Sequence, residues 1–103
     1  MNAVTGAMTT LPASLTLKDA QAVLETLRQS FAAESGDVWR VDAGAVTQLD
    51  TSALAVLLEC ARIATAGGRR LQIDNIPPRL ADLARLYGVD EILHIAPAPL
   101  AAA

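Results

Sequence analysis

The sequence predicts a single α/β domain, because short β-branched runs alternate with amphipathic helical segments along the chain. Hydrophobic residues make up 52% and charged residues 18%, which is typical of a globular protein. A chain of 103 residues fits one domain. We expect a largely parallel or mixed sheet of about four strands, covered by about three to four helices. Residues 1–95 are predicted to form this domain, and residues 96–103 a flexible tail.

The first part of the chain predicts a strand followed by a helix. The strand is expected within residues 8–15, where Pro12 restricts it to an edge or an irregular stretch. The helix is expected over residues 16–33, and Thr16 with Asp19 has the spacing of a capping box. Its buried stripe follows the i, i+3, i+4 spacing of Ala20, Val23, Leu24, Leu27 and Phe31.

The middle of the chain predicts two strand and helix pairs in succession. A β-branched and aromatic run predicts a strand over residues 38–42. A brief extended piece, residues 46–49, leads into a helix over residues 52–66, which Gly67-Gly68 ends. Residues 71–74 are predicted as the next strand.

The last part of the chain predicts a short helix and one more strand. Pro77-Pro78 opens the helix, because proline is tolerated in a first turn. Gly88 ends it. Its buried stripe is predicted to be Leu80, Leu83, Ala84 and Tyr87. Residues 92–95 are expected to add a short strand.

The most informative feature is the run Asp50-Thr51-Ser52, where a short strand gives way to an apolar helix. A helix N-terminus has unpaired backbone N–H groups and a positive dipole end, so it accommodates a phosphate well. The same three residue types are also ordinary N-caps. Spacing alone leaves both interpretations open.

The helix that follows has apolar residues on two faces. At 100° per residue, its core face is predicted to hold Leu54, Leu57, Leu58, Ala61 and Thr65. The opposite face is predicted to hold Ser52, Ala55, Val56, Glu59, Arg62 and Ile63. A contiguous apolar strip beside a hydroxyl cluster indicates a docking surface, although scattered exposed apolar residues are also normal.

Other function classes lack their signatures. The sequence has no phosphate-binding glycine loop, no nucleophile elbow and no zinc-binding helix motif, so we expect no enzyme activity, cofactor or metal. His94, the single histidine, is expected to be partly buried, and Cys60, the single cysteine, to be a packing residue. With a net charge of −3 and scattered basic residues, nucleic acid is not an expected partner. No membrane-spanning stretch or signal segment is evident, which predicts a cytoplasmic protein.

Residues 41–93 resemble the STAS domain family, and the resemblance rests on Leu49-Asp50-Thr51-Ser52-Ala53-Leu54. In that family an Asp-Ser/Thr signature opens an apolar helix, and Thr51 occupies the phosphoacceptor position. The segments 46–58 and 83–89 are most similar to the MlaB type, the STAS subunits of phospholipid ABC transporters. Two features depart from the family: Ala53 replaces a glycine, and the short N-terminus leaves room for one strand instead of a hairpin.

The resemblance implies a non-enzymatic subunit that binds the ATPase of a phospholipid-transporting ABC complex, and that reaches the membrane only through this complex. The residues expected at the contact are Asp50, Thr51, Ser52, Ala55, Val56, Glu59 and Ile63. The alternative is an anti-sigma factor antagonist, switched when an anti-sigma factor kinase phosphorylates Thr51. A small hydrolase that uses Ser52 or Thr51 is a weaker third possibility, because no base is evident beside them.

Overall fold

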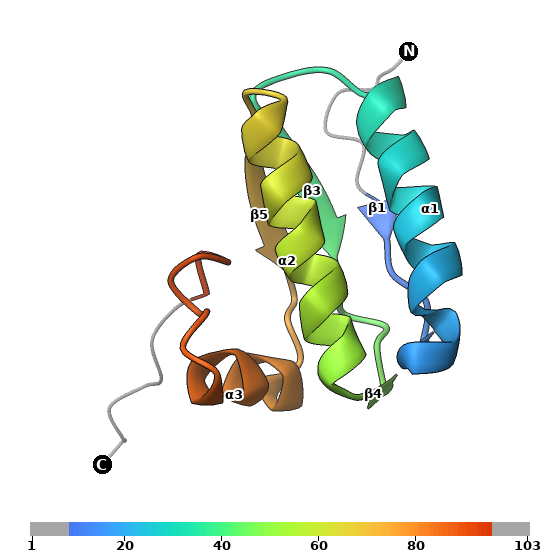
Figure 1. Ribbon diagram of the computed structural model, residues 1–103, viewed down its shortest axis with the longest axis vertical. Helices are drawn as coiled ribbons and strands as arrows, with labels where there is room; N and C mark the ends of the chain where they lie inside the picture. Colours follow the sequence, from blue (N-terminus) through green and yellow to red (C-terminus); the bar gives the residue numbers. More distant parts are fainter. Residues whose placement is uncertain (1–8, 96–103) are drawn as a thin grey trace.

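The computed structural model describes residues 9–95 and confirms the α/β class (Figure 1). Strands and helices alternate through most of this range, as the periodicity of the sequence predicts. The elements are β1 (Thr9–Thr10), β2 (Ser14–Leu15), α1 (Leu17–Ala33), β3 (Val38–Asp42), β4 (Gln48–Leu49), α2 (Thr51–Ala66), β5 (Arg70–Asp74) and α3 (Pro78–Leu86). The three helices agree with the number expected. The predicted tail, residues 96–103, lies outside the described residues.

The described strands form two parallel ladders. In the larger one β3 lies between β1 and β5, with Val38 opposite Arg70 and Asp42 opposite Asp74. The smaller ladder pairs β2 with β4, which places Leu15 opposite Leu49. Parallel neighbours need a crossover connection, and α2 supplies it between β3 and β5.

The helices α1 and α2 lie side by side over one face of the three-stranded sheet, and α3 crosses near the N-terminal end of α2 (Figure 1). Alternate strand residues such as Trp39, Val41 and Leu71 are buried toward these helices. The alternating residues point the other way: Arg40, which follows Trp39, is partly exposed, and Gln72, which follows Leu71, is exposed. One hydrophobic core therefore fills the space between the sheet and the helices.

Trp39 is fully buried at the end of the core where α1 finishes. The Phe31 ring of α1 packs edge-on against it, with ring centroids 4.9 Å apart and an interplanar angle of 67°. The Arg69 guanidinium lies over the Phe31 ring at 4.1 Å and donates a hydrogen bond to the Phe31 carbonyl oxygen at 2.8 Å. Contacts with Arg69 thus fasten the end of α1 to the turn between α2 and β5.

Gly67, the residue that caps α2, is confined by the same aromatic cluster. A Cβ atom at Gly67 would lie 2.6 Å from Phe31 Cζ, although its φ of −93° suits any residue. We expect Gly67→Ala to destabilise the protein by about 1–3 kcal/mol, because the added methyl group would push the Phe31 ring from its place against Trp39. Phe31→Leu should relieve the clash, so the same substitution in that background should cost less or stabilise the protein. A double-mutant cycle by urea denaturation measures this coupling, and additive costs would contradict the explanation.

The first predicted strand is interrupted at Pro12. Within the described part of residues 8–15, β1 and β2 are separate two-residue strands in different ladders; Met8 lies outside that part. The capping box of α1 is confirmed: the Thr16 backbone N–H donates to Asp19 Oδ2 at 3.0 Å. The predicted buried stripe of this helix packs against the core as expected.

The predictions for Thr65, Tyr87 and residues 92–95 are wrong. Thr65 is exposed, because the buried arc of α2 instead runs through Ala53, Val56, Cys60 and Ala64. This arc is wide because α2 packs against α1 on one side and against β5 and α3 on others.

The other two errors follow from the way α3 ends. Tyr87 is 57% exposed, because α3 ends at Leu86 and the chain turns at Gly88, which has a φ of +73°. Residues 92–95 form turns instead of a strand. The Leu93 backbone N–H donates to the Val89 carbonyl oxygen at 3.1 Å, so its hydrogen-bond partner is a nearby turn residue and not a neighbouring strand. Within residues 9–95, no helix has the length and hydropathy needed to span a membrane.

Candidate functional site

Asp50 connects the N-terminal ends of α1 and α2. Its Oδ1 accepts a hydrogen bond from the Ser52 backbone N–H at 2.8 Å, which makes it the N-cap of α2. Its Oδ2 accepts from the Leu17 backbone N–H at 3.1 Å, at the first residue of α1. The hydrogen bond from Ser52 is the main cause that lowers the pKa of the Asp50 carboxyl group, and the bond from Leu17 adds to it. The capping interpretation is correct for this residue, which positions both helix ends.

This geometry makes part of the stability depend on pH. The pKa of Asp50 in the folded protein lies below its usual value of 3.8, so the folded state binds fewer protons than the unfolded state as the pH falls through this region. The contribution of Asp50 is therefore present above pH 3.8 and is lost below it. We expect Asp50→Asn to be less stable than wild type at neutral pH and to show a shallower acid decline. Urea denaturation between about pH 2 and pH 5 measures both curves, and parallel curves would contradict this role.

Thr51 and Ser52 occupy the first turn of α2 and differ in exposure. Thr51 is exposed, and among residues 9–95 no hydrogen bond to its hydroxyl group is found. Ser52 is half-buried, and its hydroxyl group interacts with the Asp50 carboxylate. Thr51 therefore presents the free hydroxyl group of this helix end, at the position where the dipole favours negative charge.

Two shallow grooves flank Ala55, which is exposed one turn after Thr51. The groove toward α3 has a volume of about 440 Å³ and is lined by Thr51, Leu54, Ala55, Leu58, Tyr87 and Val89. The groove toward α1 has a volume of about 220 Å³ and is lined by Leu17, Ala20, Gln21, Leu24, Ser52, Ala55 and Val56. Both linings are mostly apolar, so the N-terminal half of α2 is a ridge between two apolar depressions.

Two large apolar side chains stand at the outer margins of this ridge. Leu17 is 77% exposed at the start of α1, and Tyr87 is 57% exposed after α3. Each of them lines a groove together with Ala55, so exposed apolar area continues across the ridge, as it does at interaction surfaces. We define the ridge surface as Leu17, Thr51, Ser52, Ala55 and Tyr87.

The sequence did not assign Leu17 or Tyr87 to the site. Leu17 has the spacing of the buried stripe, because it lies three positions before Ala20. It is the first residue of α1, however, and its side chain is not part of the core. An apolar residue directly after the predicted N-cap Thr16 was the available signal. The i, i+3, i+4 spacing placed Tyr87 on the inward stripe of the predicted helix. In the structure Tyr87 leaves that stripe, because α3 already ends at Leu86.

Besides the N-cap residue of α2, three of the predicted contact residues are not part of the ridge surface. Val56, predicted on the exposed face, is only 3% exposed and belongs to the core. Glu59 is engaged within the chain: it pairs with Arg28 at 3.2 Å and with Arg62. These hydrogen bonds, that from Arg62 foremost, lower the pKa of Glu59. Ile63 is half-buried, three turns along α2 from Thr51.

The remaining reactive side chains have different surroundings. Cys60 is fully buried, and burial raises its pKa to about 12, as expected of a packing residue. His94 was expected to be partly buried, but it is exposed, because it follows the turn that buries Leu93. No group of three or more His, Cys, Asp or Glu side chains within residues 9–95 is arranged to hold a metal ion.

The order of elements and the Asp50-Thr51-Ser52 helix end can be compared with known families. The model of the MlaB-type STAS domain family matches residues 5–95. The chain belongs to this family. No curated protein matches it significantly. STAS domains are generally binding modules without enzymatic activity, which agrees with a site made of a ridge and shallow grooves.

The replacement of the STAS glycine by Ala53 affects the interior of this domain. Ala53 is fully buried under the first turn of α2, while Thr51 and Ala55 on either side of it are exposed. Its methyl group therefore packs in the core and does not stand in the path of a partner. Alanine also favours the helical conformation over glycine at this position, by about 1 kcal/mol.

Proposed function

We propose that this STAS domain is a non-enzymatic subunit that binds and supports the ATPase of a phospholipid-transporting ABC complex on the cytoplasmic side of the membrane. The ridge surface is the contact in this proposal. The observation that carries it is the exposed Thr51 hydroxyl group on a helix end that two apolar grooves flank. Protein interfaces combine buried apolar area with about one hydrogen bond per 100–200 Å² of that area.

The ridge surface offers exposed apolar area and a positioned hydroxyl group, and the grooves beside it are shallow. Leu17 and Tyr87 provide apolar area that only a partner can bury. Thr51 provides a hydrogen-bonding group that is already positioned by the Asp50 cap. The grooves are shallow and open, which suits protruding side chains of a protein better than an enclosed small molecule.

Co-purification tests the proposal directly. The tagged chain and the ATPase subunit of the proposed transporter are co-expressed, and the complex is measured by size-exclusion chromatography with light scattering. We expect a stable complex that survives dilution, together with higher ATPase activity of the transporter when the chain is present. Separate elution of the two proteins at micromolar concentration would contradict the proposal.

The alternative, an anti-sigma factor antagonist, draws support from the same hydroxyl group. Thr51 is exposed at the first position of α2, where an added phosphate would meet the positive end of the helix dipole. Incubation with ATP and a candidate anti-sigma factor kinase, followed by mass spectrometry, separates the two functions. Stoichiometric phosphate on Thr51 would favour the switch over the transporter subunit.

A further inference from the structure

The outer edge of β5 has hydrogen-bonding groups that no strand of the described chain uses. β5 ends the order β1-β3-β5, so only one of its edges is paired. The Arg70 N–H donates to the Asp37 carbonyl oxygen at 2.8 Å, and the Asp74 carbonyl oxygen accepts from the Ala43 N–H at 2.9 Å. Backbone groups alternate along a strand, so Leu71 and Ile73 direct theirs to the open edge.

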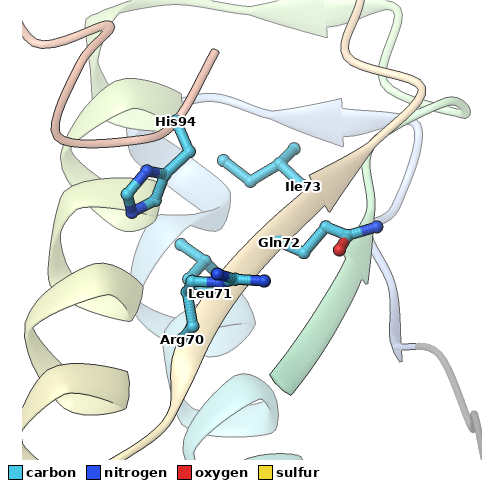
Figure 2. A pocket seen from close by; sticks show the side chains of 5 residues that line it. All are labelled: Arg70, Leu71, Gln72, Ile73 and His94. Atoms are coloured by element: carbon cyan, nitrogen blue, oxygen red, sulfur yellow. The ribbon is translucent and has the colours of Figure 1, made fainter. Parts of the chain in front are cut away.

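An open groove runs along this edge. Its volume is about 360 Å³, and its lining consists of four successive β5 residues and His94: Arg70, Leu71, Gln72, Ile73 and His94. Figure 2 shows His94 across the groove from the strand, on the C-terminal segment. The groove shares no lining residue with the two grooves of the ridge surface. An extended segment added here would leave Thr51 uncovered.

The sequence of β5 is complementary to itself in the antiparallel direction. About a two-fold axis at Gln72, Arg70 of each copy stands opposite Asp74 of the other, and Leu71 stands opposite Ile73. The backbone agrees with this register, because Leu71 and Ile73 carry the outward groups and would form the hydrogen-bonded pairs.

The charges also agree with this register. Arg70 is exposed and has no ion pair within residues 9–95, whereas Asp74 is partly buried beside Arg40 at 3.0 Å. Asp74 accepts hydrogen bonds from Gln72 and Arg40, which hold its carboxylate in place on the strand's polar face. A second arginine from across the edge would meet this carboxylate on its remaining exposed side. Opposite charges directly across two strands stabilise the pairing.

We propose that β5 pairs antiparallel with β5 of a second copy of this chain, forming a two-fold dimer with one continuous sheet. Such an interface is isologous: each Arg70 and Asp74 contact occurs twice. The pairing covers two edges whose backbone groups no strand within residues 9–95 pairs. The dimer presents two ridge surfaces, whatever partner these surfaces bind.

Sedimentation equilibrium from about 1 µM to about 1 mM tests the dimer, a range that brackets weak association. The wild type should dimerise as its concentration rises. Arg70→Glu should raise the dissociation constant about tenfold or more at low salt, because it creates two like-charge pairs with Asp74. High salt should restore part of the loss. Arg79→Glu makes the same charge change at an exposed site on α3 and should dimerise as the wild type does.

Amide hydrogen exchange assigns the edge. In the dimer, the amides of Leu71 and Ile73 should be protected, whereas in monomeric Arg70→Glu they should exchange rapidly. The Gln72 amide, which faces β3, should be protected in both. Three results would overturn the proposal: a monomer at every concentration, equal dissociation constants for the two glutamate variants, or protection of Leu71 and Ile73 in the monomer. The last result would mean that another part of the same chain covers the edge.

Discussion

In the proposed complex, Thr51→Glu should weaken binding to the ATPase by about 100-fold or more, because a carboxylate would be buried in the interface without a partner, at a cost of about 3–5 kcal/mol. The fold should tolerate this change. Thr51 is exposed in the first turn of α2, where a negative charge interacts favourably with the helix dipole. Isothermal titration or surface plasmon resonance with the purified ATPase measures the loss.

Thr65→Glu is the matched control for this experiment. Thr65 is also an exposed threonine of α2, but it lies in the last turn, where the dipole disfavours a negative charge. The two variants should therefore rank oppositely in binding affinity and in the free energy of unfolding. Thr65→Glu should be slightly less stable yet bind normally, and Thr51→Glu should be stable yet bind poorly. Equal binding by both variants would exclude the ridge surface as the contact.

Trp39→Ala should produce the largest loss of stability, about 3–5 kcal/mol. Trp39 is the largest fully buried side chain, and its removal leaves a cavity between β3 and the Phe31 ring. Domains of this size are stable by only about 5–15 kcal/mol, so the variant should unfold at much lower temperature or urea concentration. Circular dichroism during thermal and urea denaturation measures the change.

Val38→Ala controls for changes on the same strand. Val38 precedes Trp39 on β3, and its side chain is 37% exposed on the other face of the sheet. Its truncation should change the free energy of unfolding by about 0.5 kcal/mol or less. Similar losses for the two variants would show that strand propensity, and not the core around Trp39, determines the effect.

Periodicity and end signals predicted most of the fold, but they could not predict how many neighbours surround α2. The wheel of α2 separates an inward from an outward face, and it placed Leu54 and Leu57 correctly. Val56 lies beside that face, and whether it is buried depends on α1, α3 and β5 all packing around the same helix. Burial of this kind is a tertiary property, which no local pattern contains.

The candidate site shows the same division between local and tertiary information. The cap by Asp50 follows from local chemistry, so the sequence located the helix end within one residue. The margins of the ridge surface are Leu17, at the start of α1, and Tyr87, directly after α3. These segments meet the N-terminal end of α2 only in the folded chain. Glu59 was predicted on the outward face of α2, and no local pattern shows that Arg28 of α1 pairs with it.

The double hydrogen bond of Asp50 has a consequence for the kinetics of partner binding. Because one carboxylate holds the first residues of α1 and α2, Leu17 and Thr51 are fixed relative to each other before any partner arrives. The entropic cost of ordering these residues is then part of folding, and association can proceed by rigid docking. Substitutions on the ridge surface should accordingly change the dissociation rate far more than the association rate.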